Sequence, residues 1–165
     1  MRRRVALALG LALVPAAAPA LAAAPAPVAL PPIIAKQIAS AKLSGVRVLV
    51  PSKIDAGLPA SHLYGSGGAS GKGYDIQLAA APGCADADAC FVAEFWGDPG
   101  ALNLKTRVTL TKGIDGAFLA SRCGASCAPA TIEWREFGSR YTIQFMGSRA
   151  ALVALADSAI EVGPR

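Results

Sequence analysis

The sequence predicts an α+β fold, in which an antiparallel β-sheet of about six strands is built from hairpins and an N-terminal and a C-terminal helix pack on one face. Two observations carry this prediction. Several segments alternate apolar and polar residues and are joined by short, glycine-containing connections, as antiparallel strands are. A helical spacing of apolar residues, by contrast, occurs near the two ends of the chain.

The first 22 residues have the pattern of a secretory signal peptide. Three arginines at positions 2–4 precede an apolar run over 5–14, and Ala20-Leu21-Ala22 offers a small-residue cleavage site. We therefore expect this segment to be removed on export. The product would then be periplasmic or extracellular.

The remainder of the chain is expected to form one domain. The Ala/Pro tract at 23–31 is interpreted as a linker, and residues 32–165 as a single α+β domain, because about 140 residues suffice for one core. No later segment approaches the roughly 20 apolar residues of a membrane span, so no transmembrane segment is expected in the mature chain.

The charge of the chain argues against a nucleic-acid partner. The full sequence has 16 Lys and Arg residues and 11 Asp and Glu residues, a net charge of +5. Without the three arginines of the leader, thirteen basic residues would face eleven acidic ones, a net charge of +2. This near balance comes without a basic stripe of the kind that binds phosphates.

The N-terminal half is predicted to contain a helix, a strand and a long loop. Pro32 suits a first helical position, and the apolar spacing continues to Leu43, before Ser44-Gly45. The alternation over 46–50 predicts a strand that ends at Pro51. The proline, glycine and serine residues of 52–73 predict a long loop or a broken edge region, with at most a short strand near Leu63.

Two pairs of neighbouring strands are predicted next. Residues 74–78 and 91–95 alternate as strands, so the segment between Cys84 and Cys90 should connect them. Residues 106–111 and 117–121 should form a second pair, which turns through the glycines of 113–116.

The hairpin over 130–146 and the helix after it complete the prediction. We expect a type II′ turn on Gly138-Ser139, which places Trp134 opposite Ile143 and makes it a core residue. Ser148 is then a plausible N-cap for a helix that ends at Gly163-Pro164 and buries one face, formed by Leu152, Leu155, Ala156 and Ala159.

The four cysteines are expected to form disulfides because export leads to an oxidising compartment. Of the three possible connectivities we favour the local one, Cys84 with Cys90 and Cys123 with Cys127, since both pairs lie in turn-rich connections. A redox-active pair and a four-cysteine zinc site are the alternatives. The spacings match neither the thioredoxin-like motif nor the usual zinc knuckles, so we expect no cofactor and no metal.

Four residues are weak candidates for a ligand site. Asp86 and Asp88 could offer oxygen ligands to calcium, but no calcium-loop glycine or terminal glutamate follows at the required spacing, so we favour a solvated acidic loop. Lys72 lies in a glycine-rich stretch that fails the phosphate-loop pattern, which leaves a flexible loop or a mobile lid. His62 is the histidine that a Ser-His-Asp or Cys-His mechanism would need, but no nucleophile-elbow serine accompanies it.

Carboxylate pairs are a further possibility for acid/base chemistry, as in sugar hydrolysis. Glu94 and Asp98 are one such pair, but nothing in the sequence places them across a cleft, so surface charge is the simpler interpretation. We therefore assign no catalytic residue.

Several short motifs resemble a class of uncharacterised exported bacterial domains. They are Cys123-Gly124-Ala125-Ser126-Cys127, then Ile132-Glu133-Trp134, Tyr141-Thr142-Ile143 and Leu155-Ala156-Asp157-Ser158-Ala159-Ile160, together with the segment from Ala81 to Cys90. They cover roughly residues 74–165. The resemblance implies a shared fold and brings no activity or catalytic residue.

Three functions remain open from the sequence. The first is a non-enzymatic envelope or secreted domain that binds a protein, peptide or small ligand through the open face of the sheet or the 52–73 loop. The alternative is a hydrolase of envelope polymers or esters, which needs His62 or a carboxylate pair to converge with a nucleophile in a pocket. Whether His62, Asp86, Asp88 and Glu94 meet in one concavity distinguishes the two. A structural or inhibitory role, with the cysteine loops as a rigid surface, is the third.

Overall fold

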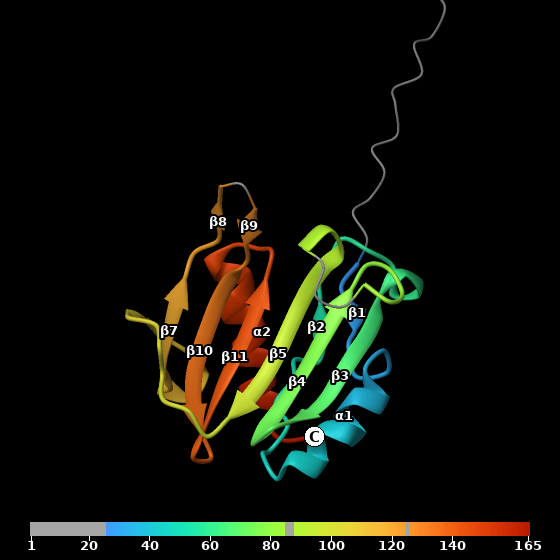
Figure 1. The fold of residues 1–165 in the computed structure, drawn as a ribbon. Coiled ribbons are helices and arrows are strands. Elements are labelled where there is room, and N and C mark those ends of the chain that lie inside the picture. Colours follow the sequence, from blue (N-terminus) through green and yellow to red (C-terminus); the bar gives the residue numbers. More distant parts are fainter. Residues whose placement is uncertain (1–25, 85–87, 125) are drawn as a thin grey trace, which may run out of the picture.

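The protein has an α+β fold built on one large antiparallel sheet (Figure 1). The structure is a computed structural model that describes residues 26–84, 88–124 and 126–165, so the predicted signal peptide lies outside the described residues. Within these ranges no helix is long and apolar enough to cross a membrane.

The large sheet has seven strands in the order β3-β4-β5-β11-β10-β7-β6, one more than the prediction of about six. The strands are β3 (Tyr64–Ser70), β4 (Gly73–Ala79), β5 (Phe91–Asp98), β6 (Thr106–Thr109), β7 (Asp115–Leu119), β10 (Ala130–Glu136) and β11 (Ser139–Phe145).

The other elements are short apart from one helix. Two small ladders pair β1 (Val28–Ala29) with β2 (Lys53–Ile54) and β8 (Arg122–Cys123) with β9 (Cys127–Ala128). The helices are α1 (Ala35–Ala41), α2 (Arg149–Val162) and four 3₁₀ turns, η1 (Lys42–Ser44), η2 (Ala60–His62), η3 (Asp88–Cys90) and η4 (Thr111–Gly113).

The chain fills the sheet from both edges. It runs through β3, β4 and β5, then crosses through residues 99–105 to the opposite edge at β6. From there β7, β10 and β11 lead back, so that β11 pairs with β5 in the middle of the sheet. This central pairing joins segments about fifty residues apart, and it decides which side chains become neighbours on the sheet.

One face of the sheet forms the core. Successive strand residues point to opposite faces, and on β4, β5, β10 and β11 one alternate set is almost fully buried. That set includes Tyr74, Ile76, Phe95, Ile132, Trp134, Tyr141 and Ile143. Helix α1 packs against β3 and β4, whereas α2 packs against β10 and β11, so the two helices cover different halves of the sheet.

The C-terminal helix and its cap agree with the prediction. The Ser148 hydroxyl accepts a hydrogen bond from the Ala151 backbone N–H at 3.2 Å, and the helix ends at Val162 with Gly163 as its cap. Its predicted inner face is buried. The N-terminal helix begins three residues later than predicted, at Ala35, and continues as η1.

The register of the β10–β11 hairpin corrects the predicted turn. Trp134 lies opposite Tyr141 instead of Ile143, so the turn falls on Phe137-Gly138 and not on Gly138-Ser139. Both turn residues have positive φ, 50° and 78°, as a type I′ turn requires. Since the register differs by two residues, every side chain keeps its face, and Trp134 is still a core residue with no exposed surface.

The segment predicted as a long loop or a broken edge region contains a complete edge strand, β3. Its glycines hid the strand because they lack side chains that could alternate. They are there because α1 lies directly on the strand: a Cβ at Gly65 would be 2.8 Å from Ile34 Cγ2, and one at Gly68 would be 2.7 Å from Ser40 Cβ.

Residues 46–50, predicted as a strand, pair with no strand in the described structure. The segment is nevertheless buried at Val48, Leu49 and Val50. The Tyr74 hydroxyl satisfies its backbone by accepting from the Leu49 N–H at 3.1 Å and donating to the Leu49 carbonyl at 3.0 Å. The segment is therefore buried as a continuous run, and neither the predicted alternation nor a strand pairing is present among the described residues.

Part of the predicted 23–31 linker belongs to the packed domain. Val28 and Ala29 pair with β2, and Leu30 is fully buried. The Leu30 N–H donates to the Ser52 carbonyl at 3.0 Å. The Ala/Pro composition concealed these contacts because their partner strand is about 25 residues further along the chain.

Candidate functional site

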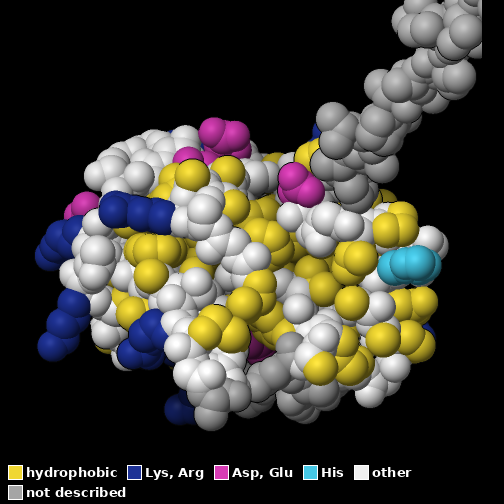
Figure 2. Space-filling view, turned by 90° about the horizontal axis from the view of Figure 1, so that it is seen from above, with side chains coloured by type: hydrophobic (Ala, Val, Ile, Leu, Met, Phe, Trp, Pro, Cys, Tyr) yellow, Lys and Arg dark blue, Asp and Glu magenta, His cyan; other side chains and the backbone are white. Residues whose placement is uncertain are grey.

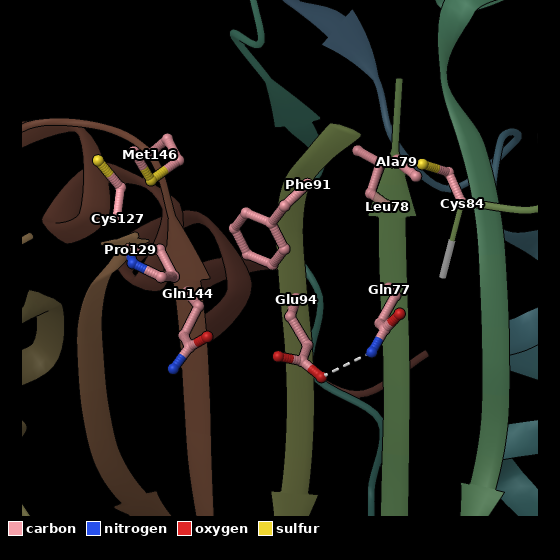
Figure 3. A pocket seen from close by; sticks show the side chains of 10 residues that line it. All are labelled: Gln77, Leu78, Ala79, Cys84, Phe91, Glu94, Cys127, Pro129, Gln144 and Met146. Atoms are coloured by element: carbon pink, nitrogen blue, oxygen red, sulfur yellow. Dashed lines mark hydrogen bonds between the residues drawn. The ribbon is translucent and has the colours of Figure 1, made fainter. Parts of the chain in front are cut away.

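A pocket of about 310 Å³ lies on the face of the sheet opposite the apolar core residues (Figure 3). Its floor is a row of three polar side chains on three adjacent strands, Gln77 on β4, Glu94 on β5 and Gln144 on β11. Gln77 Nε2 donates to Glu94 Oε1 at 3.2 Å. We call these three residues the polar row.

Apolar side chains continue the pocket towards the ends of the strands. Phe91 lies in the middle, with Met146 and Pro129 on one side and Ala79 on the other (Figure 3). We call these four residues the apolar layer. Seen from this end of the sheet, hydrophobic side chains are spread over the surface, whereas lysines and arginines gather on the side of β6 and β7 (Figure 2).

Both disulfides border the pocket. The predicted local pairing is confirmed: Cys84 bonds to Cys90, with Cα atoms 6.3 Å apart, and Cys123 bonds to Cys127, with Cα atoms 4.0 Å apart. Cys84 and Cys127 lie on opposite sides of the pocket (Figure 3). Two cross-links that are distant in the sequence thus fix the two sides of one hollow.

On the same face of the sheet, the crossing connection, residues 99–105, covers the region around Glu133. Glu133, only 4% exposed, accepts hydrogen bonds at Oε2 from the backbone N–H groups of Asn103 and Leu104, at 2.8 and 3.1 Å. Arg140 lies 3.8 Å from the other Glu133 oxygen and 2.6 Å from Asp98 Oδ2. This buried ionic network holds residues 99–105 in place, and the pocket remains where the connection does not reach.

The predicted site residues do not meet in this pocket. His62 and Lys72 are exposed, at the two ends of β3, and neither is among the residues that line the pocket. Lys72 occupies a tight β3–β4 turn, so the loop or lid expected there is a hairpin.

The acidic candidates are also separated. Asp86 lies outside the described residues and Asp88 is the first residue of η3, so the acidic loop expected there stays a prediction. Glu94 belongs to the polar row, whereas Asp98 pairs with Arg140, so the two carboxylates do not form a pair across a cleft. Among the described residues, no group of three or more His, Cys, Asp or Glu side chains could hold a metal ion.

Two core tyrosines have raised pKa values. Burial is the main cause of the raised pKa of Tyr74, partly opposed by its hydrogen bond to Leu49. Burial also raises the pKa of Tyr141. Both hydroxyls belong to the core face, so these shifts concern stability and not the pocket.

Sequence reasoning missed most of the pocket. No local motif distinguishes four of the residues that line it, namely Gln77, Gln144, Phe91 and Met146. Alternation does place Gln77, Glu94 and Gln144 on polar positions, but their adjacency depends on the pairing of β5 with β11.

Comparison with known proteins adds no assignment to this geometry. No family model matches the sequence, and neither a curated protein nor a solved structure matches it. The function must therefore be argued from the residues of the pocket.

Proposed function

We propose that the protein is an exported, non-enzymatic binding domain that holds a small ligand in the pocket between its two disulfides. The observation that carries the proposal is the pocket itself, a hollow of about 310 Å³ with polar groups on its floor and apolar side chains beside them. This combination is typical of small-molecule sites, in which apolar walls supply contact area and a few polar groups fix orientation.

The arrangement of the sheet supports this location. We take both helices to cover the apolar face of the sheet. The pocket and the crossing connection then lie on the opposite face. In support, the alternate residues of β4, β5 and β11 that line the pocket floor are only partly buried, whereas their neighbours along each strand are buried. A half-covered antiparallel sheet commonly has such a division.

The disulfides support both export and binding. Structural disulfides form and persist in oxidising compartments, in agreement with the secretory pattern of the leader. Each bond closes a loop of only a few residues, which limits its effect on the free energy of unfolding. A local role, fixing the sides of the pocket before the ligand arrives, is consistent with that position.

No observation favours the hydrolase alternative. The ten residues lining the pocket include one carboxylate and two amides, but no serine, histidine or free thiol that could act as a nucleophile or its base. His62 is exposed beside the edge strand.

A thermal-shift screen of the oxidised, signal-free protein tests the proposal, because a ligand that binds the folded state raises the unfolding temperature. The panel would contain alkylamines, sugars, short peptides, metal ions and lipids. Two variants accompany the wild type: Gln144→Phe fills the pocket, and Arg107→Phe places the same side chain on the same sheet face at the exposed strand β6.

We expect a ligand that stabilises the wild type and Arg107→Phe but not Gln144→Phe. A ligand that stabilises all three proteins equally would show that binding occurs elsewhere. A panel without any stabilising compound would equally count against a small-molecule pocket.

A further inference from the structure

Strand β3 forms one edge of the seven-stranded sheet, and helix α1 lies beside it (Figure 1). We propose that two side chains of α1, Gln37 and Ser40, block this edge and thereby prevent it from pairing with β3 of a second copy of the chain. The inference is independent of the pocket and of its ligand.

The strand itself lacks the usual protection of a sheet edge. An edge strand presents backbone N–H and C=O groups that can bind another strand, and natural edges are often protected by lysine, proline or a very short length. β3 has seven residues, and none of them is charged or a proline. All of them except Tyr64 are glycine, serine or alanine, so few large side chains oppose a neighbouring strand. Protection of this edge therefore has to come from another segment.

Helix α1 supplies that protection through two hydrogen bonds. Gln37 Nε2 donates to the Gly65 carbonyl at 2.8 Å, and the Ala69 backbone N–H donates to Ser40 Oγ at 3.3 Å. Residues three apart lie on one side of a helix, so both side chains reach the strand together. Buried residues of the same helix anchor it in the core and so fix the position of these two side chains.

The two backbone groups bound by α1 are the pair that a second copy would use. Alternate residues of a strand point their backbone groups to the same side, and the register of β3 with β4 has no shift, so Gly65, Gly67 and Ala69 share the outer side of β3. If two β3 strands pair antiparallel about a two-fold axis at Gly67, Gly65 of each copy lies opposite Ala69 of the other. The Gly65 carbonyl would then accept from the Ala69 N–H of the second copy. In the single chain Gln37 occupies that carbonyl, and Ser40 occupies that N–H.

The far edge of the sheet is protected separately. β6 has only four residues, and Arg149 Nη2, from the first residue of α2, donates to the Arg107 carbonyl at 3.4 Å. Lysine and arginine side chains also gather on this side (Figure 2), and their like charges oppose the approach of a second copy. Loss of Gln37 and Ser40 would therefore open the β3 edge and leave the β6 edge closed.

Analytical ultracentrifugation of the oxidised, signal-free protein tests the proposal. The variant Gln37→Ala/Ser40→Ala removes both contacts and keeps the helix, because alanine is the best helix former. We expect its weight-average mass to rise from that of one chain at about 10 µM towards that of two chains at about 1 mM, which corresponds to weak, reversible pairing. The wild type should remain a single chain over the same range.

Two further variants show whether the association uses β3. Lys36→Ala/Lys42→Ala removes two exposed side chains from the same helical segment and should remain a single chain. Ser66→Lys, added to Gln37→Ala/Ser40→Ala, places a charge on the edge strand in each copy and should restore the single chain.

Amide hydrogen exchange at Ala69 locates the contact. Ser40→Ala removes the acceptor of this N–H, so at low protein concentration exchange should be about tenfold faster than in the wild type. In Gln37→Ala/Ser40→Ala at high concentration the exchange should slow again, because the Gly65 carbonyl of the second copy replaces the Ser40 hydroxyl as acceptor. The same comparison can be made with Ser40→Ala alone if circular dichroism shows that the double variant is unfolded.

Three results would overturn the proposal. The first is a folded variant without its α1 contacts that remains a single chain up to the highest concentration. The second is association that persists with Ser66→Lys or occurs equally in Lys36→Ala/Lys42→Ala, since the β3 edge would then not be the pairing surface. The third is a wild type that associates as strongly as Gln37→Ala/Ser40→Ala, because the two side chains would then block nothing.

Discussion

Removal of the Glu133 carboxylate should strongly lower the free energy of unfolding of the domain. Glu133 is 4% exposed and accepts two backbone hydrogen bonds, from Asn103 at 2.8 Å and Leu104 at 3.1 Å. It also neutralises part of the charge of Arg140, 3.8 Å away. Glu133→Ala would leave two backbone N–H groups and a largely buried guanidinium short of acceptors.

The cost can be worked from these contacts. A hydrogen bond to a charged group contributes about 1.5–3 kcal/mol, and loss of one partner from a buried ion pair costs about 3–5 kcal/mol. Because Asp98 still pairs with Arg140 at 2.6 Å, the guanidinium retains a partner, and we expect a total loss of about 4 kcal/mol. With a urea m-value of about 2 kcal/mol/M, the midpoint of unfolding would fall by about 2 M.

Equilibrium unfolding in urea, followed by tryptophan fluorescence and circular dichroism, measures this change. Glu133→Gln keeps an acceptor oxygen for the backbone and should lose only about half as much. Asp115→Ala removes an exposed carboxylate that pairs with exposed Arg107, and should lose less than about 0.5 kcal/mol. A loss below about 1 kcal/mol for Glu133→Ala would show that the crossing connection is not held by this network.

Three further changes test the packing. Gly65→Val would drive a side chain into Ile34, the residue that precedes α1, and should cost about 1–3 kcal/mol in urea unfolding. Burial raises the pKa of Tyr74 well above 10 in the folded state, so its contribution to stability should be complete below about pH 10 and then fall by about 1.4 kcal/mol per pH unit until the pH reaches the folded pKa. The pKa of Tyr141 is raised in the same direction and adds to this decline. Phe137→Asn places a residue that tolerates positive φ in the type I′ turn and should raise stability by about 0.5–1 kcal/mol.

Each of these changes has its own control. Gly124→Ala meets open space without positive φ and should be neutral. Tyr74→Phe should lower stability at pH 7, because the bonds to Leu49 are lost, yet flatten the decline above pH 10. A decline as steep as that of the wild type would contradict the assignment to Tyr74. If Phe137→Asn is less stable than the wild type, the stacking of Arg47 on the Phe137 ring contributes more to stability than relief of the positive φ at position 137.

The hairpins and the helix near the C-terminus were readable from the sequence because their contacts are local. Ser148 caps α2 and the strands around Cys84 and Cys90 pair as neighbours, since in each case the partners are close along the chain. The local disulfides followed from the same proximity. The β10–β11 turn was misplaced because Phe is a poor residue for positive φ, so the sequence pointed to the following glycine instead.

Edge strand β3 and the packed part of the linker could not be predicted in this way. The glycines of β3 are explained by the approach of α1, and the burial of Leu30 by its position beside Ser52. In both cases the reason for the residue lies in another segment. Periodicity within a segment carries no information about such a partner.

By itself, then, the sequence determined the α+β class, the alternation that assigns the residues of the sheet strands to its two faces, and the C-terminal helix cap, and it favoured the observed cysteine pairs. Tertiary structure alone decided the candidate site. Gln77, Glu94 and Gln144 become neighbours because β11 returns from the far edge to pair with β5, and residues 99–105 cover one part of the face and leave another open. Side-chain direction follows from the period of a strand, but adjacency between strands is set by the packing of the whole chain.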